Sequence, residues 1–175
     1  TQDDAAGEAF DKVAKMLNLG YPGGPKVSQL AQNGDTSAIA FPRPMLNSGN
    51  GDMSFSGLKT AVLYYIKDNP PHNEQDIANI CASFEQAVID VLVAKLDWAI
   101  QEYSINQVVI GGGVTANIKL RKAFEEYAEN KGIQIIVPNK QLSTDNAIMI
   151  AVVACLDIMH GIKDRPQDVN GGLSI

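Results

Sequence analysis

The stretch Gln107-Val108-Val109-Ile110-Gly111-Gly112-Gly113 decides the fold class of this chain, because a short apolar run ends there in three glycines. The pattern predicts a strand over Gln107–Ile110 and a helix over Ala116–Glu129. A second strand over Ile133–Val137 and a second helix over Asn146–His160 follow. The order strand, helix, strand, helix predicts a parallel strand pair with a crossover helix, and therefore an α/β core.

The residues before this part are predicted to be mostly helical. Apolar side chains recur at three- and four-residue steps over residues 75–101, which predicts a long amphipathic helix. Shorter elements are expected before it: helices over Asp4–Asn18 and Lys26–Gln32, an extended segment over Ser37–Phe41, a loop over Leu46–Ser56, and a helix from Leu58 to Asn69. The sequence thus predicts one domain, an α/β core with a mostly helical insertion at about residues 26–100.

Composition narrows the class of protein. Of the 175 residues, 45% are hydrophobic and 19% are charged, which is typical of a globular domain, and no uninterrupted apolar run approaches the roughly 20 residues of a membrane span. The net charge of −6 argues against a self-sufficient nucleic-acid binder, because phosphate neutralisation needs clustered Lys and Arg. Cys81 and Cys155 lie in helical patterns with apolar neighbours, so we expect two buried, unpaired thiols in a reducing compartment.

The glycines after the first strand are a candidate binding loop. Backbone without Cβ atoms lets a ligand approach, and the following helix offers free N–H groups. Gly111–Ala116 also fits the dinucleotide pattern Gly-x-Gly-x-x-Gly/Ala. The second strand, however, ends in Pro138-Asn139, with no acid to bind ribose hydroxyls. Two interpretations remain, a ligand-binding loop and a tight turn that needs glycine.

Polar residues of the first helix form a second candidate. Glu8 and Asp11 precede a turn in which Gly23 and Gly24 bare their backbone N–H groups. Carboxylates and free N–H groups together suit a ligand that carries hydroxyls and anionic groups. The alternative is a solvated helix followed by a structural turn. Asn117 is likewise either a ligand contact or the cap of the crossover helix.

Two further polar segments allow more than one interpretation. Ser54, Ser56 and Lys59 could bind phosphate, or Ser56 could cap a helix and leave Lys59 solvated. Ser143, Thr144 and Asp145 are alternative caps of the last helix. The sequence has two histidines, His72 and His160, which are expected at the surface and do not form a metal-binding pair.

Four motifs agree in order with one known family. They are Asp3–Lys12, Gly51–Thr60, Gly111–Arg121 and Ser143–Ala151, and together they resemble the TsaD/Gcp/Kae family. These proteins are tRNA threonylcarbamoyladenosine synthases, formerly described as O-sialoglycoprotein endopeptidases. The resemblance covers nearly all of residues 1–160 and fades in the tail, 165–175. It implies that residues 1–175 are the C-terminal half of such a protein: the second subdomain of the actin/Hsp70/sugar-kinase (ASKHA) fold, with the N-terminal domain absent.

The resemblance also implies an activity and its site. The family is a cytoplasmic acyltransferase that moves threonylcarbamoyl from its adenylate to N6 of the adenosine next to the tRNA anticodon. Its nucleotide-binding positions match Asp11, Gly24 and Asn117, with Glu8, Gly112 and Gly113 as further candidates. Its metal site matches Asp145, the single carboxylate ligand of an iron or zinc ion. Two histidines of a His-x-x-x-His pair, absent from this chain, would complete that site.

The resemblance implies tRNA and threonylcarbamoyl-adenylate as substrates. A paralogous subunit of the same fold and a P-loop ATPase are the implied protein partners, and no membrane is involved. We expect the chain alone to be inactive, to hold no metal tightly, and to self-associate through an exposed sheet edge and apolar face. The alternatives are a metallo-endopeptidase of glycoproteins, for which no His-Glu-x-x-His is present, and a non-catalytic interaction subunit.

Overall fold

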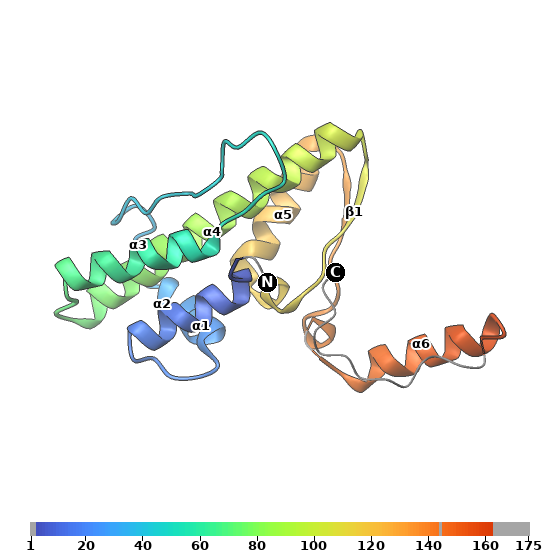
Figure 1. Cartoon of the computed structure of the whole chain (residues 1–175), viewed down its shortest axis with the longest axis horizontal. Coiled ribbons are helices and arrows are strands. Elements are labelled where there is room, and N and C mark those ends of the chain that lie inside the picture. The colour runs from blue at the N-terminus through green and yellow to red at the C-terminus, as the bar shows by residue number, and fades with distance from the viewer. Residues whose placement is uncertain (1–2, 144, 163–175) are drawn as a thin grey trace.

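Helices α1 to α4 form one body in the computed structural model, which describes residues 3–143 and 145–162 (Figure 1). Helices α2 (Gly23–Ala31) and α3 (Phe55–Asp68) pack on the long helix α4 (Glu74–Tyr103), and α1 (Ala6–Met16) packs on α2 and α3. Their apolar faces meet in one core, which includes Phe10, Val27, Leu58, Val62, Phe84 and Val88. Burial of this apolar surface holds the four helices together, and the predicted helices are confirmed.

The α/β part has the predicted topology. Strands β1 (Gln107–Val109) and β2 (Gln134–Ile136) pair in parallel, with Val108 opposite Ile135. The crossover helix α5 (Ile118–Lys131) connects them and packs on α4. A short 3₁₀ turn, η1 (Gly113–Ala116), precedes α5, so the helix begins two residues later than predicted. A second turn, η2 (Lys140–Leu142), follows β2. Ile89, Leu120 and Phe124 form a small separate core between α4 and α5.

The predicted extended segment over Ser37–Phe41 is wrong. The structure has turns and bends there. The Asp35 carboxylate accepts hydrogen bonds from the Ser37 N–H at 2.8 Å and from the Ser37 hydroxyl at 2.7 Å. An aspartate that bonds the backbone two residues ahead forms a local turn, which competes with extended backbone. These bonds from Ser37 also lower the pKa of Asp35.

Helix α6 (Ala147–Met159) lies apart from the helical body (Figure 1). None of its residues is buried, and Cys155 is exposed there as a free thiol. Cys81 in α4 is a buried free thiol, whose pKa rises to about 12 because burial and the charge of Glu85 both disfavour the thiolate. The prediction of two buried cysteines is therefore confirmed for Cys81 and wrong for Cys155.

Among the described residues, α4 is the one helix long and apolar enough to cross a membrane by length and composition. Its most apolar window, however, is 61% buried inside the protein. Core helices of soluble proteins share these properties, because they too are covered on most sides by apolar neighbours. The tail, 165–175, where the family resemblance fades, lies outside the described residues.

Candidate functional site

Asp11 joins the first two helices. Its Oδ1 atom accepts hydrogen bonds from the backbone N–H of Gly23 at 2.7 Å and of Gly24 at 3.3 Å, so a side chain of α1 caps the N-terminus of α2. These bonds explain why α2 begins at Gly23 and not at the predicted Lys26. A Cβ atom on Gly23 would lie 2.6 Å from the Cβ of Ala14, so glycine is needed for this close approach. Asp11 and Gly24 are thus neighbours.

Asn117 caps helix α5 and also ties it to two other helices. Its Oδ1 accepts a hydrogen bond from the Leu120 N–H at 2.8 Å, as the capping interpretation predicts. Its Nδ2 donates to the hydroxyl of Ser28 in α2 at 2.8 Å. The same Nδ2 donates to Oε1 of Glu85 in α4 at 2.6 Å. The side chain therefore fixes the start of α5 against α2 and α4.

A cavity of about 550 Å³ lies between these elements and collects most of the predicted nucleotide-binding residues. Its lining includes Asp11, Gly24, Gly112, Gly113 and Asn117. Gly112 has φ = 99°, a left-handed conformation that favours glycine, and a Cβ on it would meet no atom within 4 Å. The glycine turn therefore satisfies both interpretations, since the backbone requires glycine and space remains beside it for a ligand.

The remaining nucleotide candidate, Glu8, lines an adjoining cavity of about 510 Å³. The two cavities share Asp11 and the exposed Tyr21. Phe10, Pro25 and Val114 give the first cavity apolar surface, while Asp11 and Asn117 supply polar atoms. An apolar lining with a few convergent polar groups is the usual form of a small-molecule site. This arrangement can bind and orient a ligand.

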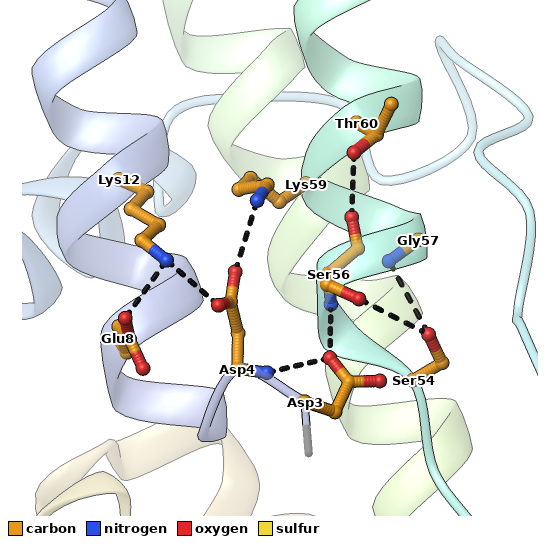
Figure 2. A network of polar contacts seen from close by, with 9 residues as sticks. All are labelled: Asp3, Asp4, Glu8, Lys12, Ser54, Ser56, Gly57, Lys59 and Thr60. Atoms are coloured by element: carbon orange, nitrogen blue, oxygen red, sulfur yellow. Dashed lines mark hydrogen bonds and ion pairs between the residues drawn. The ribbon is translucent and has the colours of Figure 1, made fainter. Parts of the chain in front are cut away.

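A network of carboxylates and amines fixes the start of α1 beside α3 (Figure 2). Asp4 lies between two lysines, with its oxygens 2.7 Å from the Lys12 Nζ and 3.2 Å from the Lys59 Nζ. Asp3 Oδ1 accepts hydrogen bonds from the backbone N–H of Ser56 at 2.8 Å and of Asp4 at 2.6 Å. The predicted solvated Lys59 is therefore wrong, because this lysine forms an ion pair with a carboxylate 55 residues away in the sequence.

The serines of this network have a structural role as well. The cap of α3 is Ser54, whose Oγ accepts a hydrogen bond from the Gly57 N–H at 3.3 Å, so the predicted cap at Ser56 is also wrong. Desolvation acts to raise the pKa of Asp3, but hydrogen bonds from Ser56 and Ser54 outweigh it and lower this pKa to about 2. The bond from Lys12, opposed by desolvation and aided by Lys59, lowers the pKa of Asp4. These hydrogen-bond donors are therefore used by carboxylates of the protein itself.

The network also holds in place the residues that follow it in the chain and line the cavity. Residues 5–7, directly after Asp4, line the cavity together with the glycine turn. Lys12 also pairs with Glu8 at 2.8 Å, and both side chains line the adjoining cavity. The hydrogen bond that Lys12 donates to Asp4, followed by that to Glu8, raises the pKa of Lys12. The ion pairs therefore keep one wall of each cavity in place.

The metal candidate Asp145 is exposed and lies just before α6. The cap of α6 is Asn146, whose Oδ1 accepts a hydrogen bond from the Met149 N–H at 3.1 Å. The capping prediction is therefore wrong for Ser143 and Asp145, while Thr144 lies outside the described residues. Ser143 is instead buried, and its Oγ accepts a hydrogen bond from the Arg121 guanidinium at 2.9 Å.

The described part of the chain does not contain a complete metal site. It holds no group of three or more His, Cys, Asp or Glu side chains positioned to bind an ion. His72 and His160 are exposed, as predicted. His160 follows the C-terminal end of the 13-residue α6, whereas Asp145 precedes its start. At a rise of 1.5 Å per residue the helix separates them by about 20 Å, so among the described residues Asp145 and His160 do not meet at one ion.

Comparison with known proteins identifies the family. A family model described as tRNA N6-adenosine threonylcarbamoyltransferase (TsaD) matches residues 1–152. The chain belongs to this family. A curated relative with that name from Geobacter metallireducens is 47% identical over 94% of the chain, and one from Kosmotoga olearia is 51% identical over 97%. These matches cover 48% and 50% of the two relatives, so the chain spans about half their length.

A third curated relative with the same name, from Desulfotalea psychrophila, is 53% identical over 87% of the chain and 45% of its own length. The family implies an α/β fold of the ASKHA type, and the parallel strand pair with its crossover helix is compatible with that fold. The family is one of transferases that act on tRNA. The resemblance inferred from the four motifs is thereby confirmed.

Sequence reasoning missed Ser28 and Glu85, the two partners of Asn117. For Glu85 a signal was present, because it lies four residues after Cys81 and three before Val88, on an apolar face of the predicted helix. A carboxylate at such a position indicates a buried partner. For Ser28 the local sequence carries no such signal, since a single serine in a short helix is common.

Proposed function

We propose that this chain forms part of a tRNA N6-adenosine threonylcarbamoyltransferase, which transfers threonylcarbamoyl from its adenylate to N6 of the adenosine next to the anticodon. One observation carries the proposal. Asp11, Gly24 and Asn117, which the family resemblance assigns to the nucleotide, line one cavity although up to 106 positions separate them in the sequence. Family membership supports the reaction, and the cavity supports this part of the chain as a site for the adenylate.

Each lining residue has a role in this proposal. Asp11 accepts hydrogen bonds from ribose hydroxyls, because a carboxylate has acceptor positions beyond the two bonds on Oδ1. Gly24 and the pair Gly112 and Gly113 let the nucleotide approach the backbone. Asn117 contacts the nucleotide from the opposite wall, and Glu8 faces the part of the ligand that extends into the adjoining cavity.

These residues contribute binding and orientation. Holding the adenylate and the tRNA in reacting geometry converts an encounter of two molecules into a step within one complex, which is worth many orders of magnitude in rate. With a net charge of −6, this part of the protein needs positive charge from other subunits to bind tRNA. We therefore propose a paralogous subunit of the same fold and a P-loop ATPase as partners, and the cytoplasm as the location, where tRNA is modified.

The finer architecture is also part of the proposal. The chain is proposed to be the second subdomain of an ASKHA fold, with residues 26–100 as its helical insertion. Asp145 is proposed to supply one carboxylate ligand to a divalent ion, iron or zinc, with the other ligands from outside this chain. Such an ion acts as a Lewis acid on oxygen ligands when bound. Alone, the chain is proposed to be inactive and to self-associate.

The test uses the full-length protein with its partner subunits. The mixture receives threonylcarbamoyl-adenylate and unmodified tRNA, and mass spectrometry of the digested tRNA measures the modified adenosine. We expect modification by the wild type and a loss of about 10²-fold in Asp11→Ala, since a misplaced donor costs that much. A protein that leaves tRNA unmodified and cleaves a glycoprotein would overturn the proposal in favour of a peptidase.

A further inference from the structure

Glu85 is a buried carboxylate in α4, a helix whose buried residues are mostly apolar. Its side chain is 4% exposed, and its neighbours Phe84, Ala87 and Val88 are buried in the core. Removing a carboxylate from water is costly, so a buried one needs hydrogen-bonded partners. The partners of Glu85 therefore indicate its role.

Both partners of Glu85 belong to the segment that begins α5. Its Oε1 accepts the hydrogen bond from the Asn117 Nδ2 at 2.6 Å, and its Oε2 lies 4.0 Å from the Lys119 Nζ. The residues just before this segment, Gly112, Gly113 and Val114, line the candidate nucleotide cavity. Glu85 itself lines an adjoining cavity of about 700 Å³, which shares Pro25, Ser28 and Asn117 with the nucleotide cavity. Glu85 thus contacts Asn117 in the wall of the nucleotide cavity but does not line that cavity itself.

The hydrogen bonds of Asn117 determine which way its amide points. The Glu85 Oε1 atom accepts the hydrogen bond from the Asn117 Nδ2, so the NH₂ group of Asn117 faces Glu85. This NH₂ group has two hydrogens, and its two acceptors are Glu85 and the Ser28 hydroxyl. The amide oxygen must then face α5, where it accepts from the Leu120 N–H. An amide oxygen has two lone pairs, so one acceptor position remains for a ligand.

We infer that Glu85 is a positioning residue that fixes the amide of Asn117 with its oxygen, and not its nitrogen, available to the nucleotide. The inference rests on the proposed function, because it takes the cavity as the adenylate site. It adds a specificity: Asn117 recognises a hydrogen-bond donor of the ligand, such as an exocyclic amine or a hydroxyl. A ligand that presents only acceptors at this point would find no partner.

The test compares two variants of the full-length protein with the wild type. Glu85→Met keeps the volume and removes the acceptor, while Glu85→Gln keeps an acceptor oxygen for the Asn117 NH₂ group. Calorimetry measures the Kd for ATP, and thermal unfolding without ligand measures Tm. We expect Kd to rise about tenfold in Glu85→Met, the scale of one lost hydrogen bond, and Tm to fall, because the Asn117 NH₂ group loses a buried acceptor. In Glu85→Gln we expect Kd within about threefold of wild type.

Ser83→Ala is the matched control. Ser83 is a buried polar residue of the same helix, two positions away, and its hydroxyl bonds the 35–39 loop and not the cavity. We expect this change to lower Tm and leave Kd unaltered. Glu85→Met in an Asn117→Ala background should have no further effect on Kd, because the residue acts through Asn117.

The outcomes separate the inference from the proposed function. A wild type that binds no nucleotide contradicts the proposed function itself. A wild type that binds ATP, with Kd unchanged in Glu85→Met, overturns the inference alone. So does a rise in Kd that persists undiminished without Asn117. If Glu85→Met does not fold, the Kd of Glu85→Gln decides, and a tenfold rise there overturns the orientation argument.

Discussion

Asp11 and Asn117 are side chains that cap a helix and also face the cavity. Asp11 holds α2 through Gly23 and Gly24, and Asn117 holds α5 through Leu120. A single residue therefore contributes both to the stability of the fold and to the proposed ligand site. Substitution at either position should change both properties, and the choice of replacement separates them.

We expect Asp11→Ala to lower the free energy of unfolding by about 1 kcal/mol, the usual effect of losing a helix cap. Asp11→Asn keeps an acceptor oxygen for the N–H groups of α2, so its loss should be smaller. Urea denaturation of both variants, without nucleotide, measures the difference. Equal stability of Asp11→Ala and wild type would contradict the capping role.

Asp145 and Asn146 give a second pair of neighbours with different roles. Because Asn146 caps α6, Asn146→Ala should lower stability by about 1 kcal/mol, whereas Asp145→Ala should change it by less than about 0.5 kcal/mol. In the full-length protein, Asp145→Ala should lose the bound metal and Asn146→Ala should keep it. Metal analysis and urea denaturation in the presence of a chelator test both statements. Metal retained by Asp145→Ala would contradict the ligand assignment.

At the scale of elements, a few polar contacts add to the hydrophobic core in fixing how the helices pack. The Asp3 and Asp4 carboxylates bind the start of α3 through Ser56 and Lys59. These contacts join residues that lie far apart in the sequence. They determine where the start of α1, and with it one wall of the cavity, is held.

Acid should weaken the junction of α1 and α3. The pKa of Asp3 is 3.8 in an unfolded chain and about 2 in the folded protein. The unfolded state therefore binds the proton more readily, and the stabilisation by Asp3, complete above pH 3.8, is lost as the pH falls towards 2. Urea denaturation across this range should show a shallower loss of stability in Asp3→Asn than in wild type. Identical slopes would contradict the contribution of Asp3.

Gly34 tests the contact between α2 and α4. A Cβ atom there would lie 2.1 Å from the backbone oxygen of Ala78 and 2.8 Å from the Cβ of Ala82. Gly34→Ala should therefore destabilise the protein by about 1–3 kcal/mol, measured by thermal or urea unfolding. Gly7→Ala is the control, because a Cβ on this helical glycine meets nothing within 4 Å, so stability should stay equal or rise. A tolerated Gly34→Ala would show that the two helices can move apart.

The elements that the sequence predicted correctly are those with a local cause. The periodicity of α4 and the glycine turn after β1 each lie within one segment, and so do the capping side chain of Asn117 and its N–H partner. The wrong predictions depend on distant or competing partners. Lys59, in α3, pairs with Asp4, which precedes α1. Asp35 forms a turn where an extended segment was expected.

The candidate site shows the same division. Asp11, Gly24, Gly112, Gly113 and Asn117 were found by motif and lie around one cavity. Ser28 and Glu85, which orient Asn117, were not found, because a hydrogen bond between helices leaves little trace in a single sequence. For Cys155, apolar periodicity predicted a helix correctly but could not tell whether another element covers its face.

At the scale of the whole molecule, the described residues divide into a packed body and an uncovered end. The cavity belongs to the body, where α1, α2 and the turn before α5 meet. Helix α6 and the small sheet are much less covered: Val109 in β1 is 72% exposed and Ile136 in β2 is 43% exposed. A sheet of two strands has an open edge on each side, which is a template for pairing with another chain.

The chain of 175 residues should therefore self-associate when it is studied alone. Ile150 and Ile158 in α6 are 73% and 77% exposed, and contiguous apolar surface of this kind drives association in water. Light scattering should show species larger than a monomer that persist at high salt, since the attraction is apolar and not ionic. Changing Ile150 and Ile158 to lysine should shift the distribution towards monomer. The same charges placed at Leu63 and Tyr64, exposed residues of α3, should shift it less, because there the apolar surface of α6 stays intact. A strict monomer at high protein concentration would mean that the exposed face of α6 is too small to drive association.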